Sequence, residues 1–224
     1  MKVKYILLTC LFLTSLTSCL KYGINLFIGE EYNVYDENFI SLLEQETNEK
    51  YNYSFSNKEF YMKDFYNRVE NEAVDLKSKK SIITLLRKSK KVVLNIGNYE
   101  FLRFVNFNDY KFEYNEKVVS TNREMFEYYL MNILETINDY TNDVVVINTF
   151  PYLKLNNTLS EQYVKILDDY RHIVNEVCAY LNIKKIDIKL SEDHILGHTL
   201  LNRQGALKII EQIKYADWKI YKSF

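Results

Sequence analysis

A chain of 224 residues, of which 47% are hydrophobic and 26% charged, is long enough for one sizeable α/β domain and short for two. Its formal net charge of −1 gives no support for nucleic-acid binding, so nucleic acid is not an expected partner. The balance of apolar and charged residues is that of an ordinary globular protein. The 20 tyrosines and 5 glycines are explained by codon bias in an AT-rich, low-GC genome.

The first eighteen residues have the pattern of a secretory signal. Lys2 and Lys4 make the start positive, and residues 5–16 form an apolar run that is too short to span a bilayer. Residues 16–19 read Leu-Thr-Ser-Cys and resemble a bacterial lipobox. In that kind of signal the cysteine thiol is diacylated and the cysteine becomes the mature N-terminus. We therefore expect residues 1–18 to be a lipoprotein signal peptide; an ordinary secretory signal with an incidental cysteine is the alternative.

Under this prediction Cys19 carries the lipid, residues 19–23 form a short tether, and residues 24–224 form a single domain. Two acyl chains suffice for stable anchoring, so the expected location is the extracytoplasmic face of the membrane of a low-GC bacterium. The membrane is then a partner through the lipidated N-terminus. Cys178 would be the one cysteine left in the domain, because Cys10 leaves with the signal, and a single cysteine excludes a disulfide framework.

Loss of Lys2 and Lys4 leaves 27 basic against 30 acidic residues, a net charge of −3. Two basic clusters, at residues 77–80 and 87–91, flank a short predicted helix. We interpret them as solvated helix ends; contact with anionic lipid headgroups is an alternative interpretation.

In the first half of the domain, an apolar run at residues 24–28 predicts a strand that ends at Gly29. Asp36 is the predicted N-cap of a helix that continues to Thr47. The elements predicted next are a strand at 51–56, helices at 62–74 and 81–88, and a strand at 91–96 that ends at Gly97. Residues 101–119 have mixed signals; an insertion at this point would form a wall or lid over a site.

In the second half, the spacing from Thr121 to Glu124 is that of a capping box and predicts the start of a helix that reaches Ile137. The same spacing from Thr158 to Glu161 predicts another helix, which runs to about residue 181. The remaining predicted elements are strands at 143–150 and 185–190 and a last helix capped by Asn202. Because strands and helices alternate, the sequence predicts a five-stranded, doubly wound parallel sheet with helices on both faces.

The order of elements, together with short motifs after the first and third predicted strands, resembles the SGNH (GDSL-type) hydrolases over nearly all of the mature chain. The family's Gly-Asp-Ser motif corresponds to Gly29-Glu30-Glu31, and its Gly-x-Asn-Asp motif to Gly97-Asn98-Tyr99-Glu100. The resemblance implies a flavodoxin-like three-layer sandwich and, in the family, ester hydrolysis by a serine nucleophile. Glu31 would occupy the nucleophile position and Tyr99 the oxyanion-hole asparagine, unless a one-residue slip brings in Asn98.

The other motif positions also depart from the family pattern. We expect Glu59 at the position of the second motif's glycine, where a side chain would crowd the oxyanion hole. Measured back from Gly205, the last motif places Leu200 at the histidine and Gly197 at the aspartate. A two-residue insertion would instead let His198 serve as the base.

The three histidines carry no further catalytic pattern. His172 lies off the apolar face of its predicted helix and is expected to be solvated. His194 and His198 are four residues apart, a spacing that can bind Zn²⁺ on a helix, but Gly197 lies between them and predicts a loop with surface histidines rather than a metal site.

Three hypotheses follow from these patterns. The first is a membrane-anchored SGNH-hydrolase-like domain that has lost esterase activity and acts in binding, with a glycan or acylated ligand in its cleft, or as a scaffold. The second is a divergent esterase, lipase or deacetylase acting on acylated cell-surface glycans or lipids. The third is a nucleotide or flavin binder, which the lack of a Gly-rich phosphate loop after any predicted strand disfavours, so that no cofactor is expected.

Overall fold

The structure is a computed structural model that describes residues 23–54, 61–70, 74, 79–109, 111–141, 143–148, 161–197 and 200–221. Its centre is a parallel sheet in the strand order β4-β1-β5-β8-β9. The strands are β1 (Ile24–Gly29), β4 (Tyr51–Ser54), β5 (Ser89–Asn95), β8 (Val144–Ile147) and β9 (Lys184–Ile186). β1 pairs in parallel with both β4 and β5, which are the next two strands of this sheet along the chain. A first strand that lies between the second and the third is the flavodoxin-like order.

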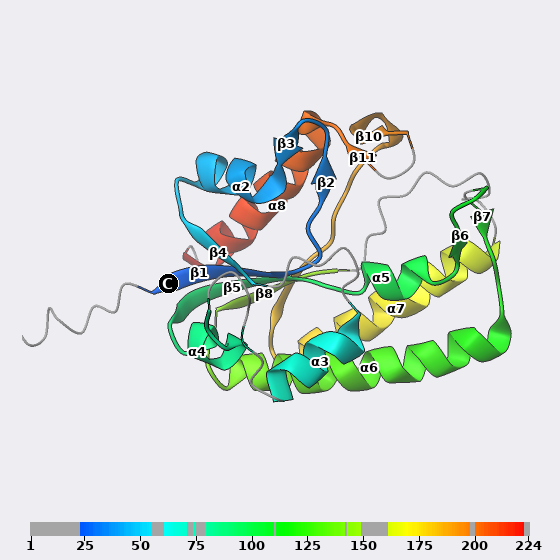
Figure 1. Cartoon of the computed structure of the whole chain (residues 1–224), viewed down its shortest axis with the longest axis horizontal. Coiled ribbons are helices and arrows are strands. Elements are labelled where there is room, and N and C mark those ends of the chain that lie inside the picture. Colours follow the sequence, from blue (N-terminus) through cyan, green and yellow to red (C-terminus); the bar gives the residue numbers. More distant parts are fainter. Residues whose placement is uncertain are drawn as a thin grey trace, which may run out of the picture.

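Helices cover both faces of this sheet, as the sequence predicted (Figure 1). One face carries α2 (Phe39–Thr47) and α8 (Arg203–Tyr221), which pack against each other. The opposite face carries α3 (Met62–Glu70), α4 (Ile82–Leu86), α6 (Glu116–Asn138) and α7 (Glu161–Tyr180). The chain is therefore an α/β three-layer sandwich, and the predicted fold class is confirmed.

Side chains of successive strand residues point to opposite faces and so divide the apolar core in two. In β1, Leu26 and Ile28 belong to the cluster under α6 and α7, whereas Phe27 belongs to the cluster under α2 and α8. In β5, Val92 and Leu94 likewise face the first cluster. Because the sheet is covered on both sides, its strands are apolar almost throughout, which is why they were recognisable in the sequence.

Three smaller groups of helices and strands lie beyond the carboxyl ends of the strands. A second sheet joins β2 (Asn33–Val34) and β3 (Glu37–Asn38) to β10 (Ile195–Leu196) and β11 (Leu200–Leu201), in the order β10-β11-β2-β3. The predicted insertion at 101–119 is resolved into the end of α5 (Asn98–Leu102), the hairpin of β6 (Val105–Asn106) and β7 (Lys111–Phe112), and the start of α6. A short 3-10 helix, η1 (Glu192–His194), precedes β10.

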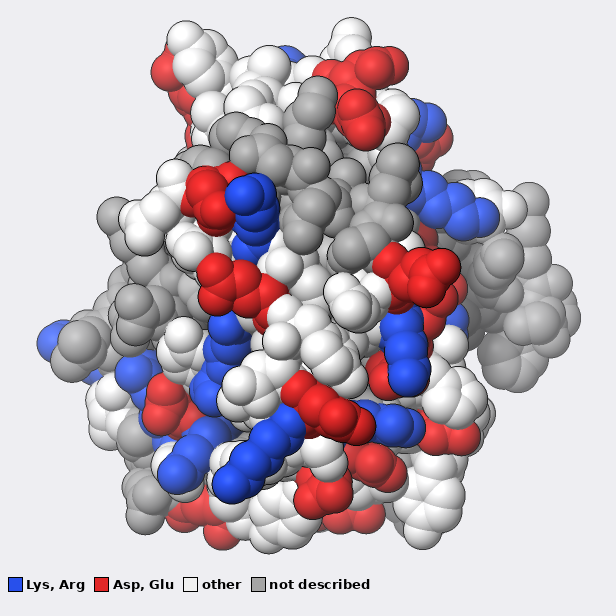
Figure 2. Space-filling view, turned by 90° about the vertical axis from the view of Figure 1, so that its right-hand side faces the viewer, with Lys and Arg blue, Asp and Glu red and all other residues white. Residues whose placement is uncertain are grey.

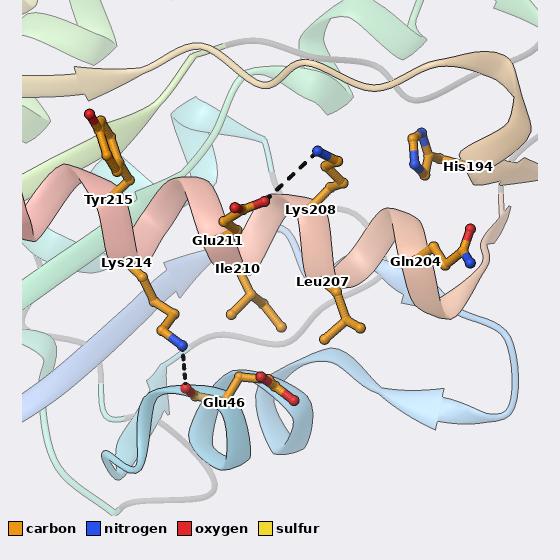
Figure 3. Close-up of a pocket in the computed structure, with 9 residues that line it drawn as sticks. All are labelled: Glu46, His194, Gln204, Leu207, Lys208, Ile210, Glu211, Lys214 and Tyr215. Atoms are coloured by element: carbon orange, nitrogen blue, oxygen red, sulfur yellow. Dashed lines mark hydrogen bonds and ion pairs between the residues drawn. The ribbon is translucent and has the colours of Figure 1, made fainter.

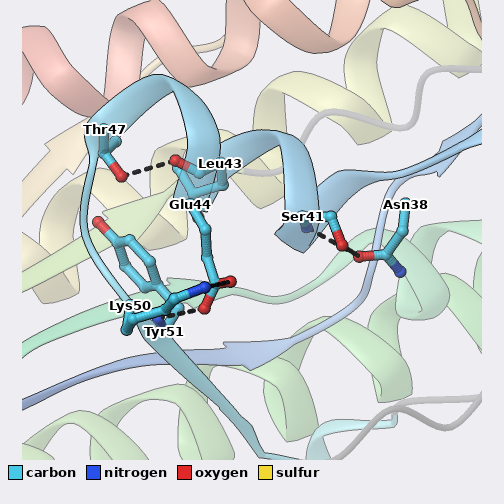
Figure 4. Close-up of polar contacts among 7 residues, drawn as sticks. All are labelled: Asn38, Ser41, Leu43, Glu44, Thr47, Lys50 and Tyr51. Atoms are coloured by element: carbon cyan, nitrogen blue, oxygen red, sulfur yellow. Dashed lines mark hydrogen bonds and ion pairs between the residues drawn. The ribbon is translucent and has the colours of Figure 1, made fainter.

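Two predicted caps are wrong. Asn38, not Asp36, is the N-cap of α2, since its side-chain oxygen accepts a hydrogen bond from the Ser41 amide at 2.9 Å (Figure 4). Asp36 has φ +55° and lies in the turn between β2 and β3. α6 begins at Glu116 with Asn115 as its N-cap, so Thr121 lies inside the helix, where its hydroxyl donates to the Lys117 carbonyl. Asn115 caps six residues earlier and extends the helix.

The other boundaries agree with the sequence to within a few residues. Asn202 caps α8 as predicted, because its side-chain oxygen accepts from the Gly205 amide at 2.8 Å. The fifth strand ends at Ile186 rather than Leu190. The predicted capping box at Thr158, strand residues 149–150 and strand residues 55–56 lie outside the described residues. Within the described part of the chain, no helix is both long and apolar enough to cross a membrane.

Candidate functional site

Two glycines with positive φ mark the carboxyl ends of β1 and β5. Gly29 has φ +113°, and a Cβ there would lie 1.9 Å from the carbonyl oxygen of Asn95 on the neighbouring strand. Gly97 has φ +97° and precedes α5. Only glycine adopts such backbone angles without strain. Both glycines therefore allow the chain to turn sharply at the same edge of the sheet, where α/β folds place their sites.

Glu30 lies directly behind this edge and is buried, with 5% of its surface exposed. Its carboxylate accepts a hydrogen bond from the Tyr99 backbone N–H at 3.0 Å. The Asn95 side-chain amide donates to the Glu30 carbonyl at 2.6 Å, and the Tyr32 hydroxyl donates to the Asn95 side-chain oxygen at 3.2 Å. Gly97 is the N-cap of α5 and has no side chain that could accept a hydrogen bond from the first turn of the helix. Glu30, which directly follows β1, supplies that acceptor.

The environment of Glu30 opposes ionisation. Burial raises the pKa of its carboxyl to about 8, and the hydrogen bonds donated by Tyr99 and Asn98 offset only part of that rise. The nearby carboxylate of Glu100 raises it further. Glu30 is thus held mainly as a neutral acid at neutral pH, enclosed by the protein and joined to the backbone of α5.

Glu100 links the other side of α5 to α3. Its carboxylate accepts from the Met62 backbone N–H at 3.0 Å, and burial raises its pKa to about 7 against the opposing effect of the Arg103 guanidinium. The Arg103 guanidinium lies 4.3 Å from the centre of the Tyr61 ring, which fixes the same helix by a cation–π contact. Two buried acids therefore hold α5 between the end of β1 and the start of α3.

Glu31, at the predicted nucleophile position, lies in a different setting. It is half-buried, and its carboxylate accepts a hydrogen bond from the Asn38 side-chain amide at 2.6 Å. This contact ties the residue to the segment that leads into α2. The residue at this position is therefore hydrogen-bonded to Asn38 of the second sheet.

The two candidates for the oxyanion position are both occupied by other contacts. Tyr99 uses its backbone N–H for Glu30, and its ring lies 6.0 Å from that of Tyr61. Asn98 is 3% exposed, and its side-chain amide lies 3.4 Å from the Asn95 side-chain oxygen and also bonds Glu30. The one-residue slip considered above therefore leaves the Asn98 amide inside the buried network, where it does not face the open edge.

The segment before α8 comes next to the segment after β1 through the second sheet. Leu201 of β11 is in register with Val34 of β2, and the Tyr35 backbone N–H donates to the Leu201 carbonyl at 2.9 Å. Leu200 is half-buried in β11, and Gly197 has φ +61° after β10. The first and last motif regions thus converge at one edge. Glu59 and His198 lie outside the described residues.

His194 has a structural role in the described residues. It closes η1, where the Ser191 amide donates to its Nδ1 at 3.1 Å and the Ser191 hydroxyl lies 2.8 Å from the same nitrogen. This is a capping box, so the serine–histidine pair provides hydrogen-bond partners for the backbone groups at the start of the 3-10 helix. His172 is exposed, as predicted, and lies 3.0 Å from Glu176. No group of three or more histidine, cysteine or acidic residues within the described ranges has a geometry that would hold a metal ion.

Two surface cavities lie away from the ends of β1 and β5. A cavity of about 550 Å³ runs beside α8 and α2 and includes His194, Lys208 and Lys214 in its lining (Figure 3). Another, of about 500 Å³, lies at the carboxyl ends of β8 and β9, where the Asn148 amide donates to Asp187 at 2.6 Å. On the face at the right-hand side of Figure 1, acidic and basic side chains alternate without a patch of one sign (Figure 2).

Solved structures share this arrangement. An acetylxylan esterase from Geobacillus stearothermophilus matches with a TM-score of 0.57 and 14% identity over 88% of this chain and 96% of that one. The chain has an SGNH-hydrolase-like fold. A lipase/acylhydrolase from Enterococcus faecalis (TM-score 0.53, 15% identity, 87% and 96% covered) and an extracellular lipase from Streptomyces rimosus (TM-score 0.55, 12% identity, 87% and 100% covered) match it similarly. No protein-family model matches the sequence, and no curated protein sequence does.

The sequence did not predict the buried hydrogen-bond network that lies behind the carboxyl edge of the sheet. The sequence carried one signal for it, which is a single polar residue, Asn95, at the end of an apolar strand. A buried asparagine must find hydrogen-bond partners, and here it joins Glu30, Tyr32 and Asn98. The two acids of the opening motif therefore divide into a framework residue, Glu30, and a residue facing the second sheet, Glu31.

Proposed function

We propose that this chain is a membrane-anchored surface lipoprotein whose SGNH-hydrolase-like domain has lost esterase activity and acts in binding or as a scaffold. One observation carries the proposal. At the position that the family resemblance assigns to the catalytic serine, this chain has Glu31, whose carboxylate accepts a hydrogen bond from Asn38. A carboxylate there does not replace a serine alkoxide in acyl transfer, and its negative charge opposes the developing oxyanion.

The contacts of α5 support the same conclusion. An oxyanion hole needs donors that point to where the negative charge develops. The Tyr99 N–H donates to Glu30 instead, and the Asn98 amide lies in the buried network. These contacts support the proposal that the edge lacks a nucleophile and an oxyanion donor, while Gly29 and Gly97 both have positive φ.

The ligand class follows from the fold neighbours. Those neighbours are an acetylxylan esterase and lipases, which by their names act on acylated glycans and on lipids. We propose a glycan or an acylated molecule as the ligand of the candidate site at the carboxyl ends of the strands. The motif positions that would line it are Gly29, Glu31, Glu59, Gly97, Tyr99 and Leu200.

A second candidate function is a divergent esterase, lipase or deacetylase that acts on acylated cell-surface glycans or lipids. The observation in its favour is that the matched structures are of enzymes of this fold. It requires His198 as the base and a serine from another position. In that case the wild-type protein hydrolyses an ester and His198→Ala abolishes the rate.

The experiment that separates the two is ester hydrolysis by the full mature protein. We expect p-nitrophenyl acetate and butyrate to remain intact above the rate of a heat-denatured sample, with a known lipase as positive control. Turnover that a serine-directed fluorophosphonate removes would contradict the proposal. Anchoring is tested separately, because Cys19→Ala should move the protein from the membrane fraction to the soluble fraction.

A further inference from the structure

The amino-terminal edge of the sheet, opposite the candidate site, carries a concentration of positive charge. The described segment 79–97 contains six basic residues, and residues 76–99 contain no acidic one. Five of the six are exposed, namely Lys79, Lys80, Arg87, Lys88 and Lys90. We call these five residues the basic edge. The chain as a whole is slightly acidic, so this concentration is local.

The chain enters the fold against the basic edge. The Ile24 backbone N–H donates to the Lys88 carbonyl at 3.0 Å. A Cβ on Gly23 would lie 2.5 Å from the Cβ of Lys90, so the two backbones are in close contact. The first described residue of the domain therefore lies directly beside two of the five cations, at the end of the sheet where β1 begins (Figure 1).

The length of chain before Gly23 sets how far this edge can lie from the anchor. Four residues separate Cys19 from the start of β1, and fully extended they span only about 14 Å. Charges so close to a membrane fall within about two Debye lengths of its surface at physiological ionic strength. An anionic surface attracts a lysine or arginine that comes within about one Debye length of it, and a tether this short lets the basic edge reach that range.

Two acids at this end of the sheet have partners of their own. Asp143 lies 2.8 Å from Lys184, and Glu49 accepts from the Asn25 side-chain amide at 3.0 Å. Arg87 lies over the ring of Tyr140, which follows α6, so the basic edge reaches the C-terminal end of that helix. The N-terminal end of α6, with Lys117, lies at the far side of the molecule (Figure 1).

We propose that the basic edge docks on anionic lipid headgroups, so that the domain lies on its own membrane with the candidate site facing away from it. The inference rests on the proposed anchor at Cys19. Lipid and basic residues would then act as two signals of one attachment. The ligand of the candidate site would come from outside the membrane that holds the protein.

The test uses the mature chain 19–224 coupled through the Cys19 thiol to a maleimide lipid in vesicles, which separates docking from natural acylation. Cys178 does not compete for the reagent, because it is buried and burial raises the pKa of its thiol to about 12. A water-soluble acetylating reagent then reports the exposure of each lysine by mass spectrometry. The vesicles contain either phosphatidylcholine alone or phosphatidylcholine with 30% phosphatidylglycerol.

We expect Lys88 and Lys90 to react roughly threefold or more slowly on the anionic vesicles than on the neutral ones, and the difference to vanish in 1 M salt. Lys117 should react equally on both. Lys88→Glu with Lys90→Glu should remove the protection at Lys79 and Lys80. The charge-matched control, Lys117→Glu with Lys165→Glu, should keep it.

Equal reactivity of Lys88 on both vesicles, or equal protection of Lys117, would overturn the docking inference. Neither result would depend on the natural anchor, since the lipid is attached chemically. Conversely, retention of Cys19→Ala in cell membranes would contradict the proposed lipidation and leave the vesicle result standing.

Discussion

Glu30 and Glu31 are adjacent in the chain, yet the structure places them in opposite environments. Glu30 is 5% exposed and joined to α5, β5 and the buried network, whereas Glu31 is half-buried and bonded to Asn38 in the second sheet. Replacing Glu30 would unpair the Tyr99 N–H in the core, while replacing Glu31 would remove the acceptor of the Asn38 side-chain amide. Two adjacent acids at this strand end therefore differ in role: Glu30 belongs to the framework of the edge, and Glu31 lies at its surface.

The largest expected effect is at Gly29, the strand end that directly precedes the two glutamates. Gly29→Ala should destabilise the protein by about 4 kcal/mol or prevent folding, because the new Cβ meets the Asn95 carbonyl and φ is +113°. Gly197→Ala is the control, since a Cβ there meets nothing within 4 Å. It should cost about 1 kcal/mol, from its positive φ alone. Urea unfolding measures both; equal losses would show that the close approach at Gly29 is unimportant.

Substitution of each glutamate in turn tests the difference between their two environments. Glu30→Ala should cost about 3 kcal/mol, since it leaves the Tyr99 N–H and the Asn98 side-chain amide in a buried cavity with fewer partners. Glu30→Gln, which resembles the neutral acid, should recover most of the loss. Glu31→Ala should cost less than about 1 kcal/mol. A larger loss for Glu31→Ala than for Glu30→Ala would reverse the roles assigned here.

The buried acids also predict how stability depends on pH. The folded-state pKa of Glu30 is about 8 against an ordinary value of 4.5, and that of Glu100 is about 7. Between pH 4.5 and 8 the folded state therefore binds more protons than the unfolded chain. The contribution of these acids is complete below pH 4.5 and is lost as the pH rises through 7 and 8. The free energy of unfolding attributable to them should fall over this range by a few kcal/mol.

The measurement is a series of urea titrations from pH 5 to pH 8.5 on wild type and Glu30→Gln. The glutamine variant lacks the ionisation at residue 30, so its stability should fall less steeply with pH. Parallel curves for the two proteins would show that Glu30 does not titrate in this window.

The smallest effects concern the helix caps at the same edge. Asn38→Ala and Asn202→Ala should each cost about 1 kcal/mol, because each removes the side-chain oxygen that caps α2 or α8. Asp36→Ala should be nearly neutral, since Asp36 caps nothing. Thermal unfolding would rank the three, and a loss at Asp36 as large as at Asn38 would restore the cap predicted from the sequence.

The sequence predicted the sheet well because its strands are buried on both faces and read as continuous apolar runs, as in residues 92–94 and 144–147. It predicted Asn202 correctly as the N-cap of α8, because no neighbouring residue competes for that position. It failed at Asp36 and Thr121, where Asn38 and Asn115 fulfil the same local rule at another position. Local rules do not say which of two competent residues the tertiary structure uses.

The candidate site was predictable only as far as its turns. Gly29 and Gly97 mark strand ends by themselves, and both have positive φ. The hydrogen bond from Tyr99 to Glu30 joins residues 69 positions apart, and the pairing of Leu201 with Val34 joins two-residue strands. Neither has a periodic pattern in the sequence. The roles of Glu30 and Asn98 therefore appear only once the chain is folded.

The central claim is that no serine in this protein acts as an esterase nucleophile. Its most direct test is the intact mass of the purified mature protein after incubation with a fluorophosphonate, beside a lipase labelled under the same conditions. The account predicts that the lipase gains one adduct and that this protein gains none. A stoichiometric adduct on a single serine, lost on prior heat denaturation, would contradict it.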